Sequence, residues 1–353
     1  MEGEEVFYSY KKIKFLSYER DSEKLVVIFS GFNGPDAERQ QSYNYIRSLI
    51  NLNVNKLFIL DNHGDRGSYY VGNIDQGSVE MSVFELIEFQ RRKLEITRKN
   101  VILCGSSKGG SAALYFGLKY GYGEVISGAP QIKISDYLGS LEHTQETLSF
   151  ITNDVPSSVI HLNSMIENQI QGFNGETKLN FFSSLSDWQY KAHLLPFLNK
   201  LDEKKITYSL EMSDYPSHSE VGGYFGSYLY ETIYNSAFDR TLPVTETIFI
   251  RSPNKIEYDT QTNEDGLEFA YYFLLEDKVI EKRWYSKVSD GEIEILNLEN
   301  KKVSIIVFVK DRYGNIIFKN HSVWFLSPKT TIRVNNMIEK PNLGSSPFEY
   351  SSF

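Results

Sequence analysis

The residue of this sequence best placed for chemistry is Ser107, at the centre of the segment Gly105-Ser106-Ser107-Lys108-Gly109. The segment has the G-x-S-x-G spacing of a nucleophile elbow, in which a serine occupies a sharp turn between a strand and a helix. Such a turn strains the backbone, so small neighbours are needed to avoid collisions across it. The hydroxyl then lies exposed above the strand end, at the positive pole of the helix. The same residues also fit an ordinary strand–loop–helix junction.

A serine alone is a weak nucleophile, because it needs a base to accept its proton and an acid to orient that base. His218 follows the last predicted strand of the first domain, and Asp187 follows the strand before it. Since all three residues lie at carboxyl ends of strands, they can converge, and we predict a catalytic triad. Asp187 also fits a helix N-cap, and His218 a surface histidine. Asp214 and Glu220 are the alternative acids.

Three backbone N–H groups are candidates for an oxyanion hole, which binds the negative oxygen of the reaction intermediate. One is that of Lys108, which directly follows the serine. The others are those of Gly31 and Phe32, in a glycine-bearing loop after an early strand. This loop also fits a plain strand-to-loop turn. The Lys108 side chain suggests a serine–lysine dyad as well, but in an elbow the residue after the serine points away from it.

Polar residues after two early strands are candidates for contact with a substrate. They are Asn33 in the first loop, and His63, Asp65 and Arg66 after the second strand. Open α/β sheets bind ligands at this edge, although the same residues fit a solvated loop equally well. No cluster has the spacing of zinc ligands, so we expect no metal site.

Strands and helices alternate from Leu25 to Ala237, which predicts an α/β domain with a mainly parallel sheet. Continuous apolar runs such as Leu25–Ser30 are typical of strands buried on both faces. Helices are expected at Gln40–Asn51 and at Ser82–Thr97, the latter with Val83, Leu86, Ile87 and Phe89 facing inward. The expected strands are Leu25–Ser30, Lys56–Asp61, Val101–Cys104, Val125–Pro130, Lys178–Leu185 and Ile206–Met212, and the further helices follow Ser107, follow Asp187 and span Tyr224–Ala237.

The helices from Ile134 to Gln171 interrupt this alternation, and we interpret residues 134–174 as a lid inserted over the site. His143 and His161 lie in the lid and fit packing or surface positions better than catalysis. The first domain is predicted to span residues 1–242.

The chain changes character after Leu242-Pro243-Val244. Short strands separated by turn residues follow, with no helical periodicity, and they predict an antiparallel β-sandwich over residues 243–335. The expected strands are Ile248–Ile250, Leu267–Leu275, Val279–Tyr285, Glu292–Leu298, Val303–Val309 and Ile316–Phe325. Residues 336–353 are predicted to form a C-terminal tail.

Composition excludes several classes of protein. A net charge of −9 and a pI near 5.3 argue against nucleic-acid or anionic-membrane partners. The sequence has no apolar run long enough for a membrane helix, and its acidic start, Met1–Glu5, does not read as a signal peptide. Its single cysteine, Cys104, excludes an internal disulfide. We therefore expect a cytoplasmic protein.

The elbow and the order Ser107, Asp187, His218 resemble the α/β-hydrolase superfamily over roughly Leu25 to Ala237. This resemblance implies an α/β-hydrolase fold with a helical lid insertion, followed here by the β-sandwich.

A narrower likeness rests on three segments: Phe29-Ser30-Gly31-Phe32, the residues from Gly105 to Tyr115, and Ser127-Gly128-Ala129-Pro130. Together they resemble the hydrolase-like secretion proteins of the bacterial accessory Sec system and related hydrolase-like proteins of capsular and surface-polysaccharide biosynthesis. This likeness implies O-acetyl transfer or ester chemistry on surface glycans. The chain is shorter at its N-terminus than those proteins, and its motifs do not distinguish an acyl donor from water.

Two hypotheses of different class follow. The first is a serine esterase or O-acyltransferase acting on a small-molecule or glycan ester, with no resident cofactor and with acetyl-CoA or an acyl ester as possible donors. The alternative is a non-catalytic partner protein in the biosynthesis or export of surface glycans or glycoproteins. A peptidase is a third class that the sequence neither favours nor excludes.

Overall fold

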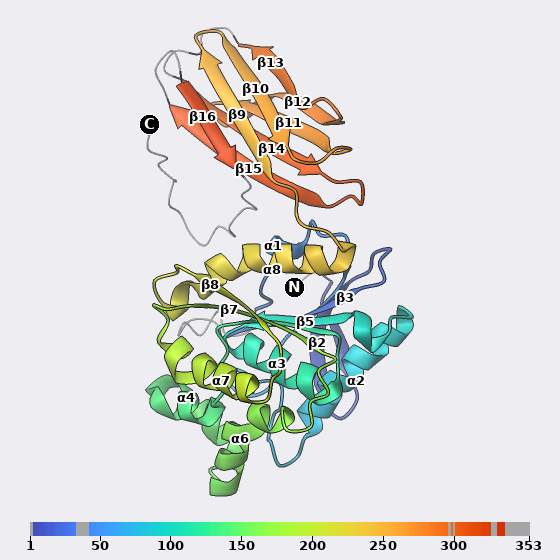
Figure 1. Ribbon diagram of the computed structural model, residues 1–353, viewed down its shortest axis with the longest axis vertical. Coiled ribbons are helices and arrows are strands. Elements are labelled where there is room, and N and C mark those ends of the chain that lie inside the picture. The colour runs from blue at the N-terminus through green and yellow to red at the C-terminus, as the bar shows by residue number, and fades with distance from the viewer. Residues whose placement is uncertain (1–2, 33–41, 296–297, 299–300, 326–329, 336–353) are drawn as a thin grey trace. The chain divides into compact units, whose positions relative to one another are not determined.

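The computed structural model describes the chain except for residues 1–2, 33–41, 296–297, 299–300, 326–329 and 336–353 (Figure 1). Contacts divide the chain into two compact units. The α/β unit holds Met1–Ile46 and Val54–Ile233, and the β unit holds Arg47–Asn53 and Tyr234–Phe353. The predicted boundary at residues 242 and 243 stays a prediction. The predicted tail, residues 336–353, lies outside the described residues.

The α/β unit is built on a mainly parallel sheet. Its strands are β1 (Glu5–Tyr8), β2 (Lys12–Tyr18), β3 (Leu25–Phe29), β4 (Asn55–Ile59), β5 (Val101–Ser106), β6 (Glu124–Gly128), β7 (Lys178–Ser184) and β8 (Ser209–Ser213). Over the residues that the structure describes, their order is β1-β2-β4-β3-β5-β6-β7-β8. β3 to β8 pair in parallel, whereas β1 and β2 form an antiparallel hairpin at one edge. Every residue of β3, β4, β5 and β6 is buried, as expected for strands covered on both faces. The predicted fold class is confirmed.

Helices cover both faces of this sheet (Figure 1). Those of the α/β unit are α2 (Ser78–Lys93), α3 (Lys108–Tyr120), α4 (Ile134–Ser140), α5 (Gln145–Thr152), α6 (Pro156–Gln169), α7 (Leu195–Glu203) and α8 (Val221–Phe238), whose last residues belong to the β unit. α2, α3 and α7 lie on one face and α8 lies on the other. None of the helices that the structure describes combines the length and apolar character needed to cross a bilayer.

Two predicted helices differ from the structure. α2 begins and ends four residues earlier than expected, and Phe89 is 51% exposed while Val83, Leu86 and Ile87 are buried. A helical period that buries these three residues turns Phe89 away from the core, toward the ring of Phe7.

The helix predicted over Gln40–Asn51 is also wrong in extent. Its described part is the single turn α1 (Ile46–Leu49), while residues 40 and 41 lie outside the described residues. Tyr45 has a φ of 60°, a left-handed conformation that prevents the helix from extending toward the N-terminus.

The predicted helices between β6 and β7 are present as α4, α5 and α6. Leu162, Met165 and Ile166 of α6 are buried in the same core as the sheet, and α6 packs against α3. Their role as a lid stays a prediction. His143 and His161 are both exposed.

The β unit contains two antiparallel sheets. Its strands are β9 (Thr245–Ser252), β10 (Lys255–Thr262), β11 (Glu268–Leu275), β12 (Lys278–Ser286), β13 (Asp290–Glu294), β14 (Lys302–Lys310), β15 (Ile316–Phe325) and β16 (Thr330–Asn335). Within the described ranges the sheets have the orders β13-β10-β9-β16 and β12-β11-β14-β15. The rings of Tyr258 on β10 and Tyr271 on β11 lie 4.2 Å apart between the two sheets. The unit is therefore a β-sandwich.

Two strands of the sandwich, β10 and β16, were not predicted. β10 alternates buried residues such as Ile256 and Tyr258 with charged ones, so its apolar content is too low for an obvious strand. β16 pairs with β9 over Thr330–Asn335, which the prediction left without a strand.

Candidate active site

Ser107 occupies a strained turn between β5 and α3. Its φ of 54° and ψ of −126° are unusual for a residue with a side chain. Its N–H donates to Gly128 O on the neighbouring strand at 2.8 Å. A Cβ atom at Gly105 would lie 2.6 Å from the Gly109 carbonyl carbon, and one at Gly109 would lie 2.3 Å from Phe29 O. The glycines are therefore required by the space available, as the elbow motif predicts.

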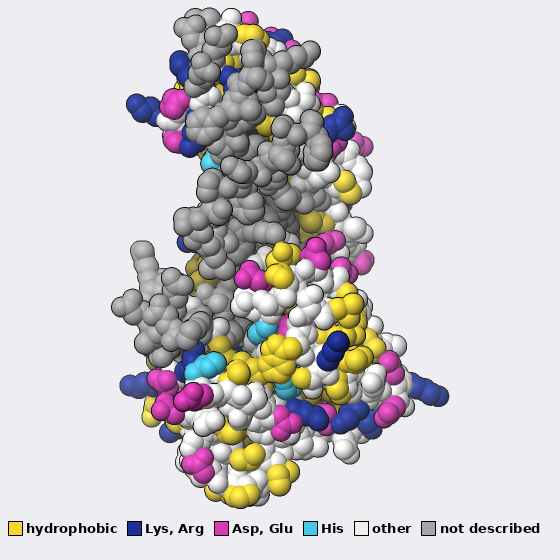
Figure 2. All heavy atoms as spheres, turned by 90° about the vertical axis from the view of Figure 1, so that its left-hand side faces the viewer, with side chains coloured by type: hydrophobic (Ala, Val, Ile, Leu, Met, Phe, Trp, Pro, Cys, Tyr) yellow, Lys and Arg dark blue, Asp and Glu magenta, His cyan; other side chains and the backbone are white. Residues whose placement is uncertain are grey.

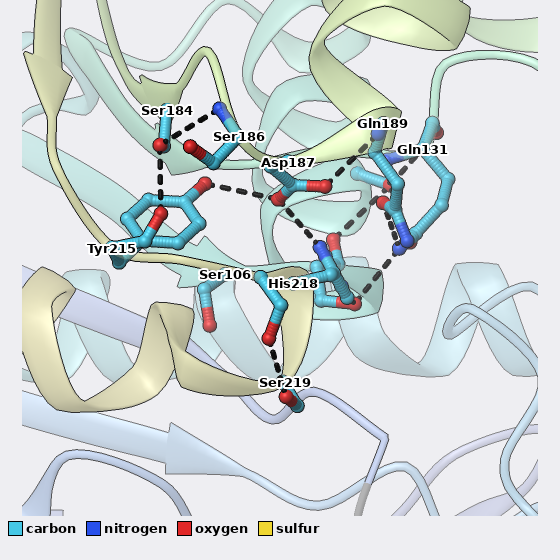
Figure 3. A network of polar contacts seen from close by, with 12 residues as sticks. Ser106, Gln131, Ser184, Ser186, Asp187, Gln189, Tyr215, His218 and Ser219 are labelled. Carbon is cyan, nitrogen blue, oxygen red and sulfur yellow. Dashed lines mark hydrogen bonds and ion pairs between the residues drawn. The ribbon is translucent and has the colours of Figure 1, made fainter.

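Hydrogen bonds join Ser107, His218 and Asp187 in a chain. Figure 3 shows His218 and Asp187 in this network. Ser107 Oγ lies 2.8 Å from His218 Nε2, and His218 Nδ1 lies 2.8 Å from Asp187 Oδ2. Asp187 follows β7 and His218 follows β8, at the carboxyl ends of adjacent parallel strands. Since a carboxylate accepts from Nδ1–H, Nε2 is left to accept the proton of the serine hydroxyl.

Asp187 is fully buried, and all its contacts are with donors. Oδ1 accepts the Gln189 N–H at 2.9 Å, and Oδ2 also accepts the Tyr215 hydroxyl at 3.0 Å. Burial works to raise the pKa of Asp187, but the hydrogen bond and charge of His218, the Gln189 N–H and the Tyr215 hydroxyl outweigh it. The pKa therefore lies below its usual value, and the group stays a carboxylate. The alternative acids, Asp214 and Glu220, are exposed to solvent.

Gln131 is a site residue that the sequence analysis missed. It follows β6 and is fully buried, and its Nε2 donates to Ser107 Oγ at 2.8 Å and to Gln189 Oε1 at 2.7 Å. The segment before it, Val125–Pro130, is predicted as a strand, and its last four residues also carry part of the family likeness. The one signal for Gln131 was that it comes directly after these small residues at a strand end.

The three predicted oxyanion donors differ in what they already bind. The Gly31 N–H donates to Asn44 Oδ1 at 2.7 Å, so it is not free to bind a substrate. In the part of the chain that the structure describes, the N–H groups of Phe32 and Lys108 have no acceptor. Lys108 is the first residue of α3, where a backbone N–H has no partner within the helix.

The Lys108 side chain lies away from the serine, as expected, in a buried ion pair. Its Nζ lies 2.8 Å from Asp61 Oδ2, and the two side chains are 3% and 1% exposed. Asp61 also accepts the Ser68 N–H at 2.7 Å. Gly67 is left-handed, with a φ of 87°, and a Cβ there would lie 2.4 Å from Nζ. The pair therefore ties the loop after β4 to the start of α3.

No protein-family model matches this sequence, and no curated protein does so either. Solved structures do match. The chain is similar to the capsule O-acetyltransferase of Neisseria meningitidis serogroup A, with 24% identity, a TM-score of 0.57, and coverage of 66% of this chain and 95% of that one. It is also similar to a fluorophosphonate-binding serine hydrolase of Staphylococcus aureus, FphF, with 14% identity, a TM-score of 0.51 and coverage of 65% and 95%. The α/β unit has the α/β-hydrolase fold.

A further match is the Glycosylation Associate Protein (Gap123) complex from Streptococcus agalactiae. The identity is 21% and the TM-score 0.56, over 68% of this chain and 48% of that one. At these identities the likenesses establish the fold, and the chemistry has to be argued from the side chains.

The residues of the α/β unit that were predicted to contact a substrate differ in burial and in hydrogen-bond partners. Asn33 lies outside the described residues. His63 Nε2 lies 3.0 Å from Lys12 O on the hairpin edge of the sheet, and Asp65 is exposed. Arg66 is buried, and its Nη1 donates to His143 O at 3.4 Å, so it links the loop after β4 to the helices before β7.

Three aromatic side chains of the α/β unit form a row beside the candidate site. They are Phe32, Tyr137 and Trp188, called the aromatic row below. The ring centroids of Phe32 and Tyr137 are 6.4 Å apart and those of Tyr137 and Trp188 are 6.1 Å apart, with interplanar angles of 24° and 17°. Trp188 directly follows Asp187 and is 49% exposed. Leu185, three residues earlier in the sequence, is 69% exposed. Figure 2 shows hydrophobic side chains gathered on one face of this domain, with histidines among them.

Proposed function

We propose that this protein is a serine-dependent esterase or O-acyltransferase that works through an acyl-enzyme. The observation that carries the proposal is the continuous hydrogen-bonded chain from Ser107 through His218 to Asp187, at a strained turn where Ser107 is partly buried. A structural serine needs neither the strain nor the histidine.

In the first half-reaction, His218 Nε2 takes the Ser107 proton while Oγ attacks the carbonyl carbon of an ester. The N–H groups of Lys108 and Phe32 bind the oxygen that becomes negative. Asp187 holds the imidazole and stabilises its positive charge. The intermediate then expels the alcohol, which takes the proton from Nε2, and the acyl group stays on Oγ.

In the second half-reaction, water or a sugar hydroxyl gives its proton to Nε2 and attacks the acyl carbonyl. Oγ leaves and recovers the proton from His218. The enzyme is an esterase when water attacks and an O-acyltransferase when the sugar does. The acyl donor is a co-substrate, either an acyl ester or a thioester such as acetyl-CoA, and the chemistry requires no resident cofactor.

We propose a carbohydrate as the alcohol part of the substrate. The aromatic row supports this, because the flat C–H face of a sugar ring stacks on an exposed indole such as Trp188. The matched structures named for a capsule O-acetyltransferase and a glycosylation-associated protein point the same way.

Replacement of the nucleophile tests the reaction class. We expect Ser107→Ala to lower kcat for p-nitrophenyl acetate by on the order of 10⁶-fold, since among the described residues no other hydroxyl is hydrogen-bonded to His218. Ser219→Ala is the matched control, because Ser219 lies one residue from His218 and is exposed, but its hydroxyl is hydrogen-bonded to Ser217 instead. Turnover by the Ser107→Ala protein at the rate of this control would rule out the mechanism.

Replacement of Trp188 tests the substrate class. We expect Trp188→Ala to raise KM for an O-acetylated sugar about tenfold, the equivalent of about 1.4 kcal/mol, and to leave kcat/KM for p-nitrophenyl acetate unchanged. Trp284→Ala, at an exposed position of the β unit, is the control. An equal loss on both substrates would argue against a sugar-stacking role. Acylation of a glycan acceptor in competition with water would identify transfer.

A second candidate function is that of a non-catalytic partner in glycan or glycoprotein assembly. The likeness to the Gap123 complex favours it, since that protein is named as an associate of glycosylation. Labelling with a fluorophosphonate probe separates the two candidates. An esterase or acyltransferase reacts at Ser107, whereas a scaffold has no need of an activated serine.

A further inference from the structure

The oxygen of Ser107 has a second partner besides His218, the side-chain amide of Gln131. Gln131 Nε2 lies 2.8 Å from Ser107 Oγ, the same separation as His218 Nε2. Gln131 is fully buried and comes from the loop after β6, so it approaches the serine from a different element than the histidine.

The orientation of this amide is fixed by its neighbours. Its oxygen accepts the hydroxyl of Tyr69 at 3.3 Å, and its nitrogen donates to Gln189 Oε1 at 2.7 Å. Its backbone N–H donates to Ser111 Oγ at 2.8 Å, which anchors the residue to α3. With Gln189 Oε1 facing it, an exchange of the Gln131 amide oxygen and nitrogen would set two oxygens against each other, so the N–H end faces the serine.

These contacts close a ring of hydrogen bonds (Figure 3). The ring runs from Ser107 to His218, to Asp187, through the Gln189 N–H and then its side chain, to Gln131, and back to Ser107. Each acceptor in it faces a donor. Because the amide nitrogen can only donate, Ser107 must accept there and must direct its single proton to His218 Nε2.

We infer that Gln131 is a further catalytic residue, which directs the Ser107 proton to His218 and stabilises the negative charge on Oγ as that proton leaves. The inference rests on the proposed function of Ser107. A neutral amide donor suits this task, because its N–H stabilises an oxyanion and its nitrogen cannot take the serine proton in place of His218. One lone pair of the serine oxygen remains available for attack.

The test measures the reaction of the serine itself, so no substrate needs to be identified. An alkyl fluorophosphonate forms a bond from phosphorus to Ser107 Oγ and releases fluoride, while the serine proton passes to His218. The second-order rate constant of labelling is measured for the wild-type chain, Gln131→Met, Gln131→Glu and Gln90→Met. Gln90 is a matched control, a buried glutamine on α2. Thermal unfolding of each variant is followed in parallel.

We expect Gln131→Met to lower the labelling rate on the order of 100-fold, as for the loss of one donor to an oxyanion, while Gln90→Met keeps the wild-type rate. Gln131→Glu gives a second signature. Its carboxylate accepts the Ser107 proton and draws it away from His218, but the protonated carboxyl donates again. The ratio of its rate to that of the wild type should therefore rise as the pH falls, a change that a merely structural role would not produce.

Two results would overturn the inference. In the first, the wild type is labelled and both Gln131 variants react within twofold of it at every pH, which leaves the proposed function of Ser107 intact. In the second, the wild type is not labelled at all, and both proposals fail together. Where Gln131→Met does not fold, the pH dependence of Gln131→Glu decides.

Discussion

At the scale of single residues, Asp187 shows how one side chain serves two elements. Its Oδ1 caps the helical segment that begins beside Gln189, while its Oδ2 accepts from His218 and Tyr215. The capping and orienting interpretations of this aspartate are therefore compatible, since a carboxylate has enough lone pairs for both.

Replacement of Asp187 by Asn should lower kcat by roughly 10⁴-fold with little change in KM, because an amide permits the wrong tautomer of His218. Hydrolysis of p-nitrophenyl acetate measures the loss. The sign of the pH dependence follows from the lowered pKa of Asp187. Its contribution to stability is fully present above the pKa of the unfolded chain and is lost as the pH falls through the lower, folded value.

Urea unfolding at several pH values therefore provides a second measurement on the same variant. The wild type should be more stable than Asp187→Asn by a constant margin above about pH 5, and the margin should shrink below about pH 4. A margin that grew on acidification would contradict the assigned direction of the shift.

The proximity of Ser107, His218 and Asp187 could be predicted, because each follows a strand end and parallel strands bring those ends together. Their catalytic roles stay predictions. The bonds of Gln131 and of Lys108 with Asp61 could not be foreseen, because the paths of the loops after β4 and β6 decide which polar side chains meet. No spacing in the sequence encodes those paths.

At the scale of elements, the turn from β5 to α3 has no space for a side chain at position 109. Any residue other than glycine at position 109 would place its Cβ atom too close to the Phe29 carbonyl oxygen. The strand β3, which carries Phe29, therefore lies against the helix start, and the serine turn depends on both.

Gly109→Ala should destabilise the chain by at least about 3 kcal/mol or prevent folding, since the added atom overlaps backbone. Gly223→Ala in α8 is the control, because its Cβ would meet no atom within 4 Å and alanine favours a helix. Thermal unfolding of the two variants measures the contrast. If the Gly109→Ala and Gly223→Ala variants were equally stable, the close contact between β3 and the serine turn would not be needed for stability.

The helices and strands could be predicted where the pattern of apolar residues was clear. Continuous apolar runs predicted β3 to β6 because both faces of these strands are buried. The polar alternation of β10 hid that strand, and the left-handed Tyr45 ended a helix for reasons of backbone conformation that periodicity does not report.

At the scale of the whole molecule, each compact unit combines segments that are distant in the sequence. The β unit takes in the last residues of α8 and the segment Arg47–Asn53. Asp311 is the centre of this arrangement: it accepts the Tyr234 hydroxyl at 2.8 Å and the Asn315 N–H at 2.9 Å, and the Asn315 side chain in turn accepts the Asn53 N–H at 2.7 Å.

Asp311→Ala should lower the free energy of unfolding by roughly 3 kcal/mol, since buried donors lose their acceptor. Asp290→Ala, at an exposed position on β13, should have little effect. Urea unfolding of both variants measures the difference, and a loss no larger than that of the control would show that Asp311 does not hold these segments.

The single cysteine of the chain, Cys104, has a practical consequence for future work. It is fully buried on β5, where burial raises its pKa, so its thiol is poorly reactive. A thiol introduced by Leu185→Cys, at a position 69% exposed and two residues before Asp187, would be the one that maleimides reach. A fluorophore or spin label can thus be attached near Asp187 without first removing a native cysteine.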